Sequence, residues 1–282
     1  MKIYQKIIVA LTAIALGLLA HPGTGMAQAV IPVVDLGSHV WAFQESAGCL
    51  LGGKLGERWL KPGETASLLR GGETYRLYTM TRFIGTATGS KPEKSGKPGG
   101  SPEFVVQMAP LPVGQEEIVA IGGQWNALPR VPRLASPDQE IYQEVVADFL
   151  KKKGMKNPKV KITQVIRIDL DGDGVEEVLI TADTYGKKLY RHLQNRGSYS
   201  LVLLRKVIHG KVENLVIEED YFPSNLGWGV PMRFWVGAVL DVDGDGVMEI
   251  VLHGMYYEGG GTSVHRVEGN KVKKVLVAGW GV

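Results

Sequence analysis

The feature that most constrains this sequence is a pair of acidic segments that repeat with the same internal spacing. IDLDGDGVEEVLI, residues 168–180, aligns without a gap to LDVDGDGVMEIVL, residues 240–252, which lies 72 positions later. Both copies contain Asp-x-Asp-x-Asp-Gly-x-x-Glu between apolar runs of β type. A gap-free match of this length indicates a duplicated β unit rather than coincidence.

Each unit is predicted to contain four strands. The strands expected beside the acidic segments cover Val165 to Leu170, Glu177 to Thr181, Phe234 to Leu240 and Glu249 to His253. Each unit then continues into a hairpin, Tyr199 to Ile208 with Val212 to Glu218 in the first, and Ser263 to Val267 with Val272 to Val277 in the second. Four strands are typical of a propeller blade or a comparable β-meander. Because two blades cannot close a propeller, we expect an incomplete or compact relative of one.

The acidic segments are predicted to bind a metal ion. Carboxylates about 5 Å apart repel by roughly 1 to 3 kcal/mol per pair, so a loop this acidic resists closing without a cation. Gly174 and Gly246 permit the sharp turn that brings oxygen ligands together, and Ca²⁺ suits many flexible oxygens better than Mg²⁺ does. Neither loop contains Cys or His, which argues against zinc. The expected ligands of two Ca²⁺ ions are Asp169, Asp171, Asp173, Val175 (through its carbonyl) and Glu177, then Asp241, Asp243, Asp245, Val247 (through its carbonyl) and Glu249.

Two other interpretations of the loops are an EF-hand and a metal-free turn. An EF-hand requires a bidentate Glu at position twelve and flanking helices, whereas position twelve here is Ile180 or Leu252 inside an apolar run. Metal-free Asp-Gly turns, whose Asp side chains cap the backbone, are the remaining alternative. Two copies with the same acidic positions favour the metal.

The pattern Asp-x-Asp-x-Asp-Gly-x-x-Glu between two β-strands resembles the calcium loop of FG-GAP and VCBS repeats, which occur in integrin α-subunit propellers and in many exported bacterial proteins. The resemblance covers about 45 residues in two places. It implies a blade-like β repeat and the same ten ligand positions. It also implies that the calcium ion is usually structural and that the partner binds elsewhere on the protein.

The first 29 residues are predicted to be a signal peptide. Lys2 and Lys6 precede an apolar run of fourteen residues, Ile7 to Ala20, which is short for a membrane span. Ala27-Gln28-Ala29 offers a small-x-small cleavage site, so we expect cleavage after Ala29 and a secreted or periplasmic protein. No later stretch approaches eighteen apolar residues, so no transmembrane segment is expected after cleavage.

The rest of the chain is predicted to be mainly β and to divide at a proline-rich joint. Residues 30–131 form an N-terminal β domain whose expected strands are Val40 to Phe43, Ala66 to Leu69, Tyr75 to Thr88, Phe104 to Met108 and Glu117 to Ile121, with a mobile loop at 89–101. Residues 132–160 form a linker and one α-helix that is capped by Ser136, ends at Gly154 and has an apolar stripe of Ile141, Val145, Val146 and Phe149. Residues 161–282 form the C-terminal pair of calcium-loop repeats.

Composition excludes several classes of protein. The 282 residues are 44% hydrophobic with a net charge of +3, and scattered Lys and Arg give no nucleic-acid footprint. The single Cys49 excludes a disulfide framework within the chain. We find no motif of a common hydrolase, kinase or nucleotide-binding protein, although His253 and His265 lie on neighbouring expected strands and could meet. A sugar platform could be built from Tyr256, Tyr257, Glu258 and Trp228, but packing of these aromatic residues beside tight turns is the more common role.

These observations lead to one functional expectation and two alternatives. We expect an exported, calcium-stabilised binding or scaffold module, not an enzyme, whose partner is a protein or a polysaccharide. The first alternative is a secreted hydrolase that acts on polysaccharide or lipid and carries structural calcium. The second is a non-catalytic subunit of an envelope assembly.

Overall fold

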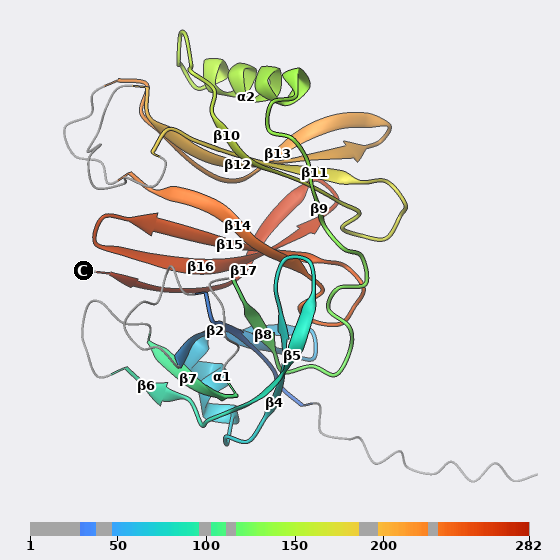
Figure 1. The fold of residues 1–282 in the computed structure, drawn as a ribbon, viewed down its shortest axis with the longest axis vertical. Coiled ribbons are helices and arrows are strands. Elements are labelled where there is room, and N and C mark those ends of the chain that lie inside the picture. Colours follow the sequence, from blue (N-terminus) through green and yellow to red (C-terminus); the bar gives the residue numbers. More distant parts are fainter. Residues whose placement is uncertain are drawn as a thin grey trace, which may run out of the picture.

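The protein is built from four layers stacked along its long axis (Figure 1). The computed structural model describes residues 29–37, 47–95, 103–110, 117–185, 197–224 and 231–281. Helix α2 (Glu140–Lys152) covers a five-stranded sheet, which packs on a four-stranded sheet, which in turn packs on a β-barrel. The prediction of a mainly β protein is therefore confirmed.

The N-terminal part is a six-stranded barrel. Its order is β2-β1-β8-β4-β5-β7, and pairing of β2 with β7 closes it, while β3 and β6 extend the sheet beside β2 and β7. The strands are β1 (Ile31–Asp35), β2 (Ala47–Leu55), β3 (Arg58–Leu60), β4 (Thr74–Tyr78), β5 (Phe83–Gly89), β6 (Glu93–Lys94), β7 (Phe104–Ala109) and β8 (Val119–Ile121).

Alternation along the barrel strands gives the barrel two apolar faces. Val34 and Leu50 point into the barrel, whereas their neighbours Val33, Cys49 and Leu51 belong to the core shared with the four-stranded sheet. Both faces of β1 and β2 are therefore buried, and the thiol of Cys49 lies within this shared core.

Two sequence predictions for this part are wrong. The expected strand Ala66 to Leu69 belongs to helix α1 (Pro62–Leu68), because Pro62 occupies the first helical position and the Glu64 carboxylate accepts a hydrogen bond from the Lys61 amide at 2.9 Å. The expected run Tyr75 to Thr88 is two strands, β4 and β5, that pair as a hairpin. Part of the expected mobile loop 89–101 is also ordered, since β6 pairs with β7, while 96–101 lie outside the described residues.

The C-terminal part consists of two antiparallel four-stranded repeats. Repeat one comprises β10 (Ile162–Ile168), β11 (Glu177–Asp183), β12 (Tyr199–Ile208) and β13 (Lys211–Tyr221), and the short β9 (Arg133–Leu134) extends its sheet. Repeat two comprises β14 (Arg233–Leu240), β15 (Glu249–Tyr256), β16 (Gly259–Glu268) and β17 (Lys271–Gly281). The eight strands expected from the sequence are confirmed.

The two faces of the repeat-one sheet have different neighbours. Val178, Ile180 and Ala182 of β11 pack beneath α2, while Leu179 between them faces the repeat-two sheet. The helix is present as predicted, and Val146 of the predicted stripe is buried, but the other two buried residues are Tyr142 and Leu150, whereas Ile141 of the stripe is 49% exposed. The predicted cap Ser136 lies before the helix and bonds the Asp138 amide at 3.2 Å.

The outer edge of β14 is closed by side chains of repeat one. The amides of Met232, Phe234 and Val236 donate to Asp220 Oδ2, Ser200 Oγ and Gln164 Oε1 at 2.6, 2.9 and 2.9 Å. The Gln164 side-chain amide also donates to the Val236 carbonyl at 3.0 Å. Polar side chains therefore take the place of a fifth strand at this edge.

Several predictions lie outside the described residues. They are residues 1–28 of the signal peptide and the strand Val40 to Phe43. Within the part of the chain that the structure describes, no helix has both the length and the apolar character needed to cross a membrane.

Candidate metal centres

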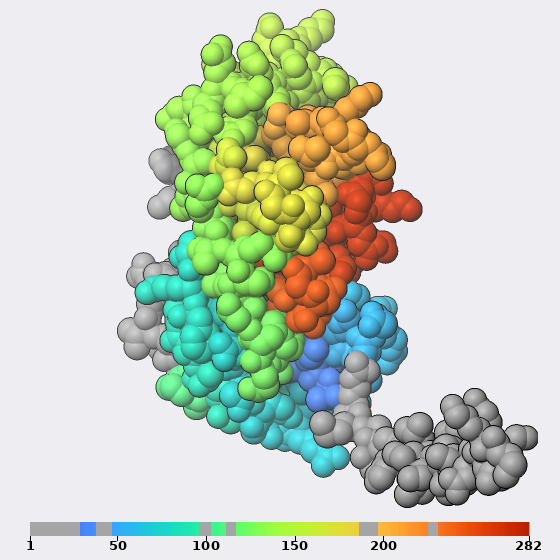
Figure 2. Space-filling model, turned by 90° about the vertical axis from the view of Figure 1, so that its right-hand side faces the viewer, coloured from blue at the N-terminus to red at the C-terminus, as the bar shows by residue number. Residues whose placement is uncertain are grey.

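The two acidic loops lie side by side on one face of the molecule. Loop one (169–177) joins β10 to β11, and loop two (241–249) joins β14 to β15. The Met248 amide of loop two donates to the Leu170 carbonyl of loop one at 2.8 Å. Arg130 bridges the loops, since its guanidinium donates to the carbonyls of Asp169 and Gly246 at 2.6 Å each (Figure 2 shows this face, with the green segment around Arg130 beside the yellow and orange-red loop regions).

The first aspartate of each loop organises the turn. Asp169 accepts hydrogen bonds from the amides of Gly172 and Gly174 at 2.7 and 3.1 Å. Asp241 accepts the equivalent bonds from Gly244 and Gly246, also at 2.7 and 3.1 Å. All four glycines have φ between +78° and +89°, a conformation that favours glycine. The repeat seen in the sequence is therefore a repeat of backbone geometry.

The glutamate at position nine accepts a hydrogen bond from a backbone amide of its own loop. Glu177 Oε2 accepts the Leu170 amide at 2.8 Å, and Glu249 Oε2 accepts the Val242 amide at 2.9 Å. Both side chains are buried, with Glu177 1% and Glu249 0% exposed. The second oxygen, Oε1, of each carboxylate accepts a bond from a basic side chain described below.

Three carboxylates converge in each loop. Asp169, Asp171 and Glu177 each offer an oxygen within 4.8 Å of the others, and so do their counterparts Asp241, Asp243 and Glu249. Oxygen-only donor sets of this kind suit hard divalent cations. The two clusters could therefore hold a metal ion, and the donor chemistry fits the predicted calcium.

The remaining predicted ligands lie outside these three-carboxylate clusters. Asp173 and Asp245 use one oxygen to accept the amide of the valine two residues on, Val175 or Val247, at 2.7 and 2.9 Å. Their side chains therefore contribute to the turn, and ligation by the two aspartates and by the valine carbonyls stays a prediction. Glu176 pairs instead with two arginines, Arg133 and Arg167.

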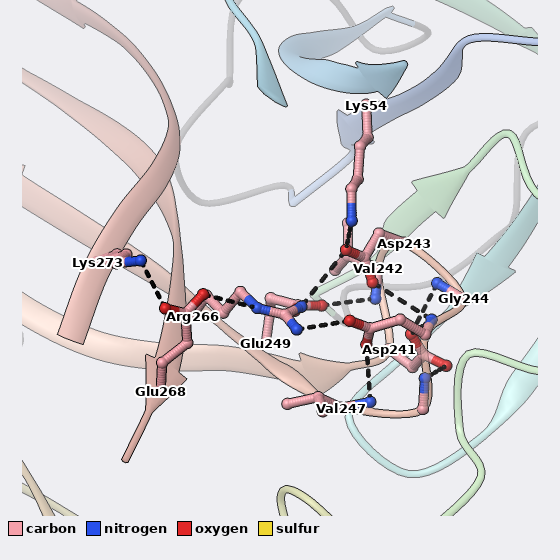
Figure 3. A network of polar contacts seen from close by, with 12 residues as sticks. Lys54, Asp241, Val242, Asp243, Gly244, Val247, Glu249, Arg266, Glu268 and Lys273 are labelled. Carbon is pink, nitrogen blue, oxygen red and sulfur yellow. Dashed lines mark hydrogen bonds and ion pairs between the residues drawn. The ribbon is translucent and has the colours of Figure 1, made fainter. Parts of the chain in front are cut away.

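Basic side chains that sequence reasoning missed contact both carboxylate clusters. In loop one, Lys206 Nζ lies 2.7 Å from Asp171 Oδ2 and 2.5 Å from Glu177 Oε1. In loop two, the guanidinium nitrogens of Arg266 lie 2.7 Å from Glu249 Oε1, 2.5 Å from Asp245 Oδ2 and 3.4 Å from Asp243 Oδ2. The Asp243 carboxylate also pairs with Lys54 of β2 (Figure 3). Each cluster thus contains its own positive charge.

Lys206 and Arg266 occupy equivalent positions in the two repeats. Val178 pairs with Arg205 and Ile250 with His265, so the next residues place Lys206 opposite Glu177 and Arg266 opposite Glu249. The sequence separations differ, 29 residues in repeat one and 17 in repeat two, because the β11–β12 connection is longer. A gap-free alignment therefore hides the equivalence, and only strand register reveals it.

The electrostatics of the two clusters differ. Burial tends to raise the pKa of Asp171, but the hydrogen bond and charge of Lys206 outweigh it and the pKa lies below its ordinary value. In loop two, burial and then the charge of Asp243 raise the pKa of Glu249 to about 8 despite Arg266. Burial also raises the pKa of Asp241, against the hydrogen bonds from Gly244 and Gly246.

A second polar cluster joins the barrel to the repeat-two sheet. His253 Nδ1 lies 2.9 Å from Thr262 Oγ1, which donates to Asp35 Oδ2, and His253 Nε2 lies 3.2 Å from Glu117 Oε2. Burial lowers the pKa of His253, but the charges of Asp35 and Glu117 outweigh it and raise the pKa above its ordinary value. His253, Thr262 and Asp35 are at most 1% exposed, so this cluster is a buried contact between layers.

His265 lies in another environment, bonded to Ser263 Oγ at 2.8 Å and 3.7 Å from Glu218. The two histidines considered together in the sequence therefore belong to separate groups of residues.

The aromatic residues considered as a sugar platform occupy the end of β15. The rings of Tyr256 and Tyr257 meet edge to face with centroids 5.9 Å apart, and Tyr256 packs so closely on Gly259 and Gly281 that a Cβ on either glycine would clash with its ring or hydroxyl. Glu258 follows in the exposed turn, and Trp228 lies outside the described residues. Their role as a ligand site stays a prediction.

Comparison with known proteins gives no match: no protein-family model fits the sequence, and no curated protein or solved structure is similar enough to show a family.

Proposed function

We propose that this protein is an exported Ca²⁺-binding repeat protein that acts as a binding or scaffold module. The observation that carries the proposal is the convergence of three carboxylate oxygens within 4.8 Å in each of two equivalent loops. The hydrogen bonds that Asp169 and Asp241 accept from glycine amides fix the turn of each loop and bring its oxygen ligands together for a cation. An extracellular module needs an affinity of only about 10⁻⁴ to 10⁻³ M for calcium.

The bound ion would stabilise the layered fold. Loop two connects the repeat-two sheet to the barrel through Lys54 and to the segment between β8 and β9 through Trp125, whose indole donates to the Asp241 carbonyl at 2.8 Å. Because loop one is bonded to loop two through Met248 and through Arg130, a cation that ties the carboxylates of either loop together would also hold both repeats in place. Blade-like repeats of the FG-GAP and VCBS kind are part of this proposal.

The hydrolase alternative has less support. It requires convergent acids or a histidine at an open cleft outside the loops. Among the described residues, His253, Asp35 and Thr262 form a group of this kind, but it is buried between two layers and does not line an open cleft.

Calorimetric titration and thermal melting of the purified protein, with calcium and with chelator, test the proposal. We expect saturable binding and a higher Tm in calcium. Replacement of both Asp171 and Asp243 by Ala should remove the binding, whereas Asp148→Ala on the exposed face of α2 should leave it unchanged. An unchanged Tm together with no heat of binding would contradict the proposal.

Export is tested separately. Cell fractionation and N-terminal sequencing of the expressed full chain should find the protein outside the cytoplasm, beginning at Val30. A cytoplasmic protein that retains Met1 would contradict this part of the proposal.

A further inference from the structure

Lys206 and Arg266 contact the same pair of carboxylates that a metal ion would use. Each approaches the aspartate at position three and the glutamate at position nine of its loop. Each also stands opposite that glutamate in the neighbouring strand. The position is repeated although the connections that lead to it differ in length, so the duplicated unit includes a cation as well as an acidic loop.

We propose that Lys206 and Arg266 are built-in counter-cations of the two loops, and that loop one exchanges its lysine for Ca²⁺ whereas loop two retains its arginine. The proposal rests on the proposed function, because it assigns calcium binding to one loop and a metal-independent ion-pair network to the other.

The charge balance of the clusters favours loop one for the metal. With its three converging carboxylates ionised and one ammonium beside them, loop one carries a net charge of −2. With its three carboxylates ionised, loop two carries −1, because both Arg266 and Lys54 face them. Replacement of Lys206 by a divalent cation would leave −1 in loop one, whereas a divalent cation added to loop two beside both of its basic partners would leave +1.

The two basic side chains also differ in how firmly they are held. Arg266 contacts four carboxylates, those of Asp243, Asp245, Glu249 and Glu268. A planar guanidinium bonds several carboxylates in a fixed geometry, whereas a lysine ammonium is a single charge on a flexible stem. Lys206 has two carboxylate partners, so its displacement breaks fewer ion pairs.

Access supports the same assignment. In loop one, Asp171 and Asp173 are exposed, so an ion from solvent reaches the cluster directly. In loop two, Asp241 is buried and the side chain of Asp243 is 0% exposed beneath Lys54 and Arg266. Entry of a metal there requires two basic side chains to move.

Calcium titration of five proteins tests the proposal, with terbium luminescence as an independent readout. The wild type should bind one ion. Lys206→Met should bind calcium about tenfold more tightly at that site, and Arg266→Met should gain a second site, because each loses the competing charge. The matched control is Lys151→Met, since Lys151 forms an exposed pair with Asp148 on α2 and should behave as the wild type. Lys206→Arg preserves the charge and should weaken binding, which keeps the test informative if the Met variant does not fold.

The outcomes separate this inference from the proposed function. If the wild type binds calcium and Lys206→Met and Lys206→Arg bind with the same affinity, the counter-cation inference is wrong while the proposed function stands. If the wild type does not bind but Lys206→Met does, Lys206 is a counter-cation and the proposed function is wrong. If no variant binds, both fail.

Discussion

Loops one and two have the same backbone and different surroundings. The hydrogen bonds that Asp169 and Asp241 accept from glycine amides agree in length. The position-nine glutamates accept hydrogen bonds from equivalent backbone amides. Loop one lies at the surface with one lysine, whereas loop two is enclosed by Arg266, Lys54 and Trp125. The comparison teaches that the acidic motif specifies a loop conformation, while residues from distant strands decide what balances its charge.

Removal of the basic partners should produce the largest effect. Arg266→Met would leave the buried carboxylates of Asp243 and Glu249 without their guanidinium, which should lower the free energy of unfolding by about 3 to 5 kcal/mol. Lys206→Met should cost less, about 2 to 3 kcal/mol, because Asp171 is exposed. Urea unfolding in chelator measures both values. Equal losses of unfolding free energy in the two variants would show that both loops depend equally on their basic partners.

Calcium should act through loop one. At 100 times Kd, an ion that binds only the folded state adds about 2.7 kcal/mol to the free energy of unfolding. Asp171→Ala should abolish this gain, whereas Asp243→Ala should lower the starting stability but keep the gain. Melting of both variants with and without calcium measures the difference. A gain that is lost in Asp243→Ala and kept in Asp171→Ala would reverse the assignment.

Protonation of His265 should weaken repeat two as the pH falls, against the opposite effect of the Glu249 carboxyl, whose pKa is about 8 in the folded protein. Burial and then the charge of Lys274 lower the pKa of His265 to about 4, whereas the equivalent position in repeat one is Arg205. Between pH 6.5 and 4 the unfolded chain binds a proton that the folded protein excludes, so stability falls as pH falls. The His265 contribution should be a loss of about 2 kcal/mol between pH 7 and 5.

Hydrogen exchange resolves which repeat is affected. Between pH 7 and 5, amides of β15 and β16 should retain more protection in His265→Gln than in the wild type, relative to each protein at pH 7 and after correction for the intrinsic exchange rate. Amides of β11 and β12 should respond to pH alike in the two proteins. An unchanged pH dependence in this variant would show that other groups control the acid response.

The smallest predicted difference concerns the glycine at position four. Gly172 and Gly244 have φ of +78° and +80°, so alanine strains both by about 1 kcal/mol. A Cβ at Gly244 would also lie 2.8 Å from the Trp125 ring, whereas at Gly172 it would lie 3.1 Å from the guanidinium of Arg130, a looser contact. Gly244→Ala should therefore cost about 1 kcal/mol more than Gly172→Ala in urea unfolding. Equal costs would show that Trp125 moves aside freely.

Local sequence signals predicted the repeats well. The gap-free alignment and β periodicity located all eight repeat strands and both loops, because these features depend on residues close together in the chain. Helix α1 was missed because Pro62 followed by Gly63 is also typical of a turn, and only the bond from Lys61 to Glu64 distinguishes a helix start. The apolar strands β1 and β2 were missed because both of their faces are buried and show no alternation.

The charge balance of the loops could not be predicted from the sequence. Lys54 lies 189 residues from Asp243, and its contact depends on the barrel packing on the repeat-two sheet. Lys206 and Arg266 reach their loops through strand pairing across connections of unequal length. Such partners follow from tertiary structure, which a local motif does not encode.

The closed edge of β14 limits the addition of further strands to the repeat-two sheet. An open strand edge offers amides and carbonyls to which another strand can add, whether from a further repeat or from a second molecule. Asp220, Ser200 and Gln164 already occupy the outward amides of β14 at every second residue. Repeat one therefore blocks this edge of β14, so that another strand cannot add there and the protein is protected from aggregation through it.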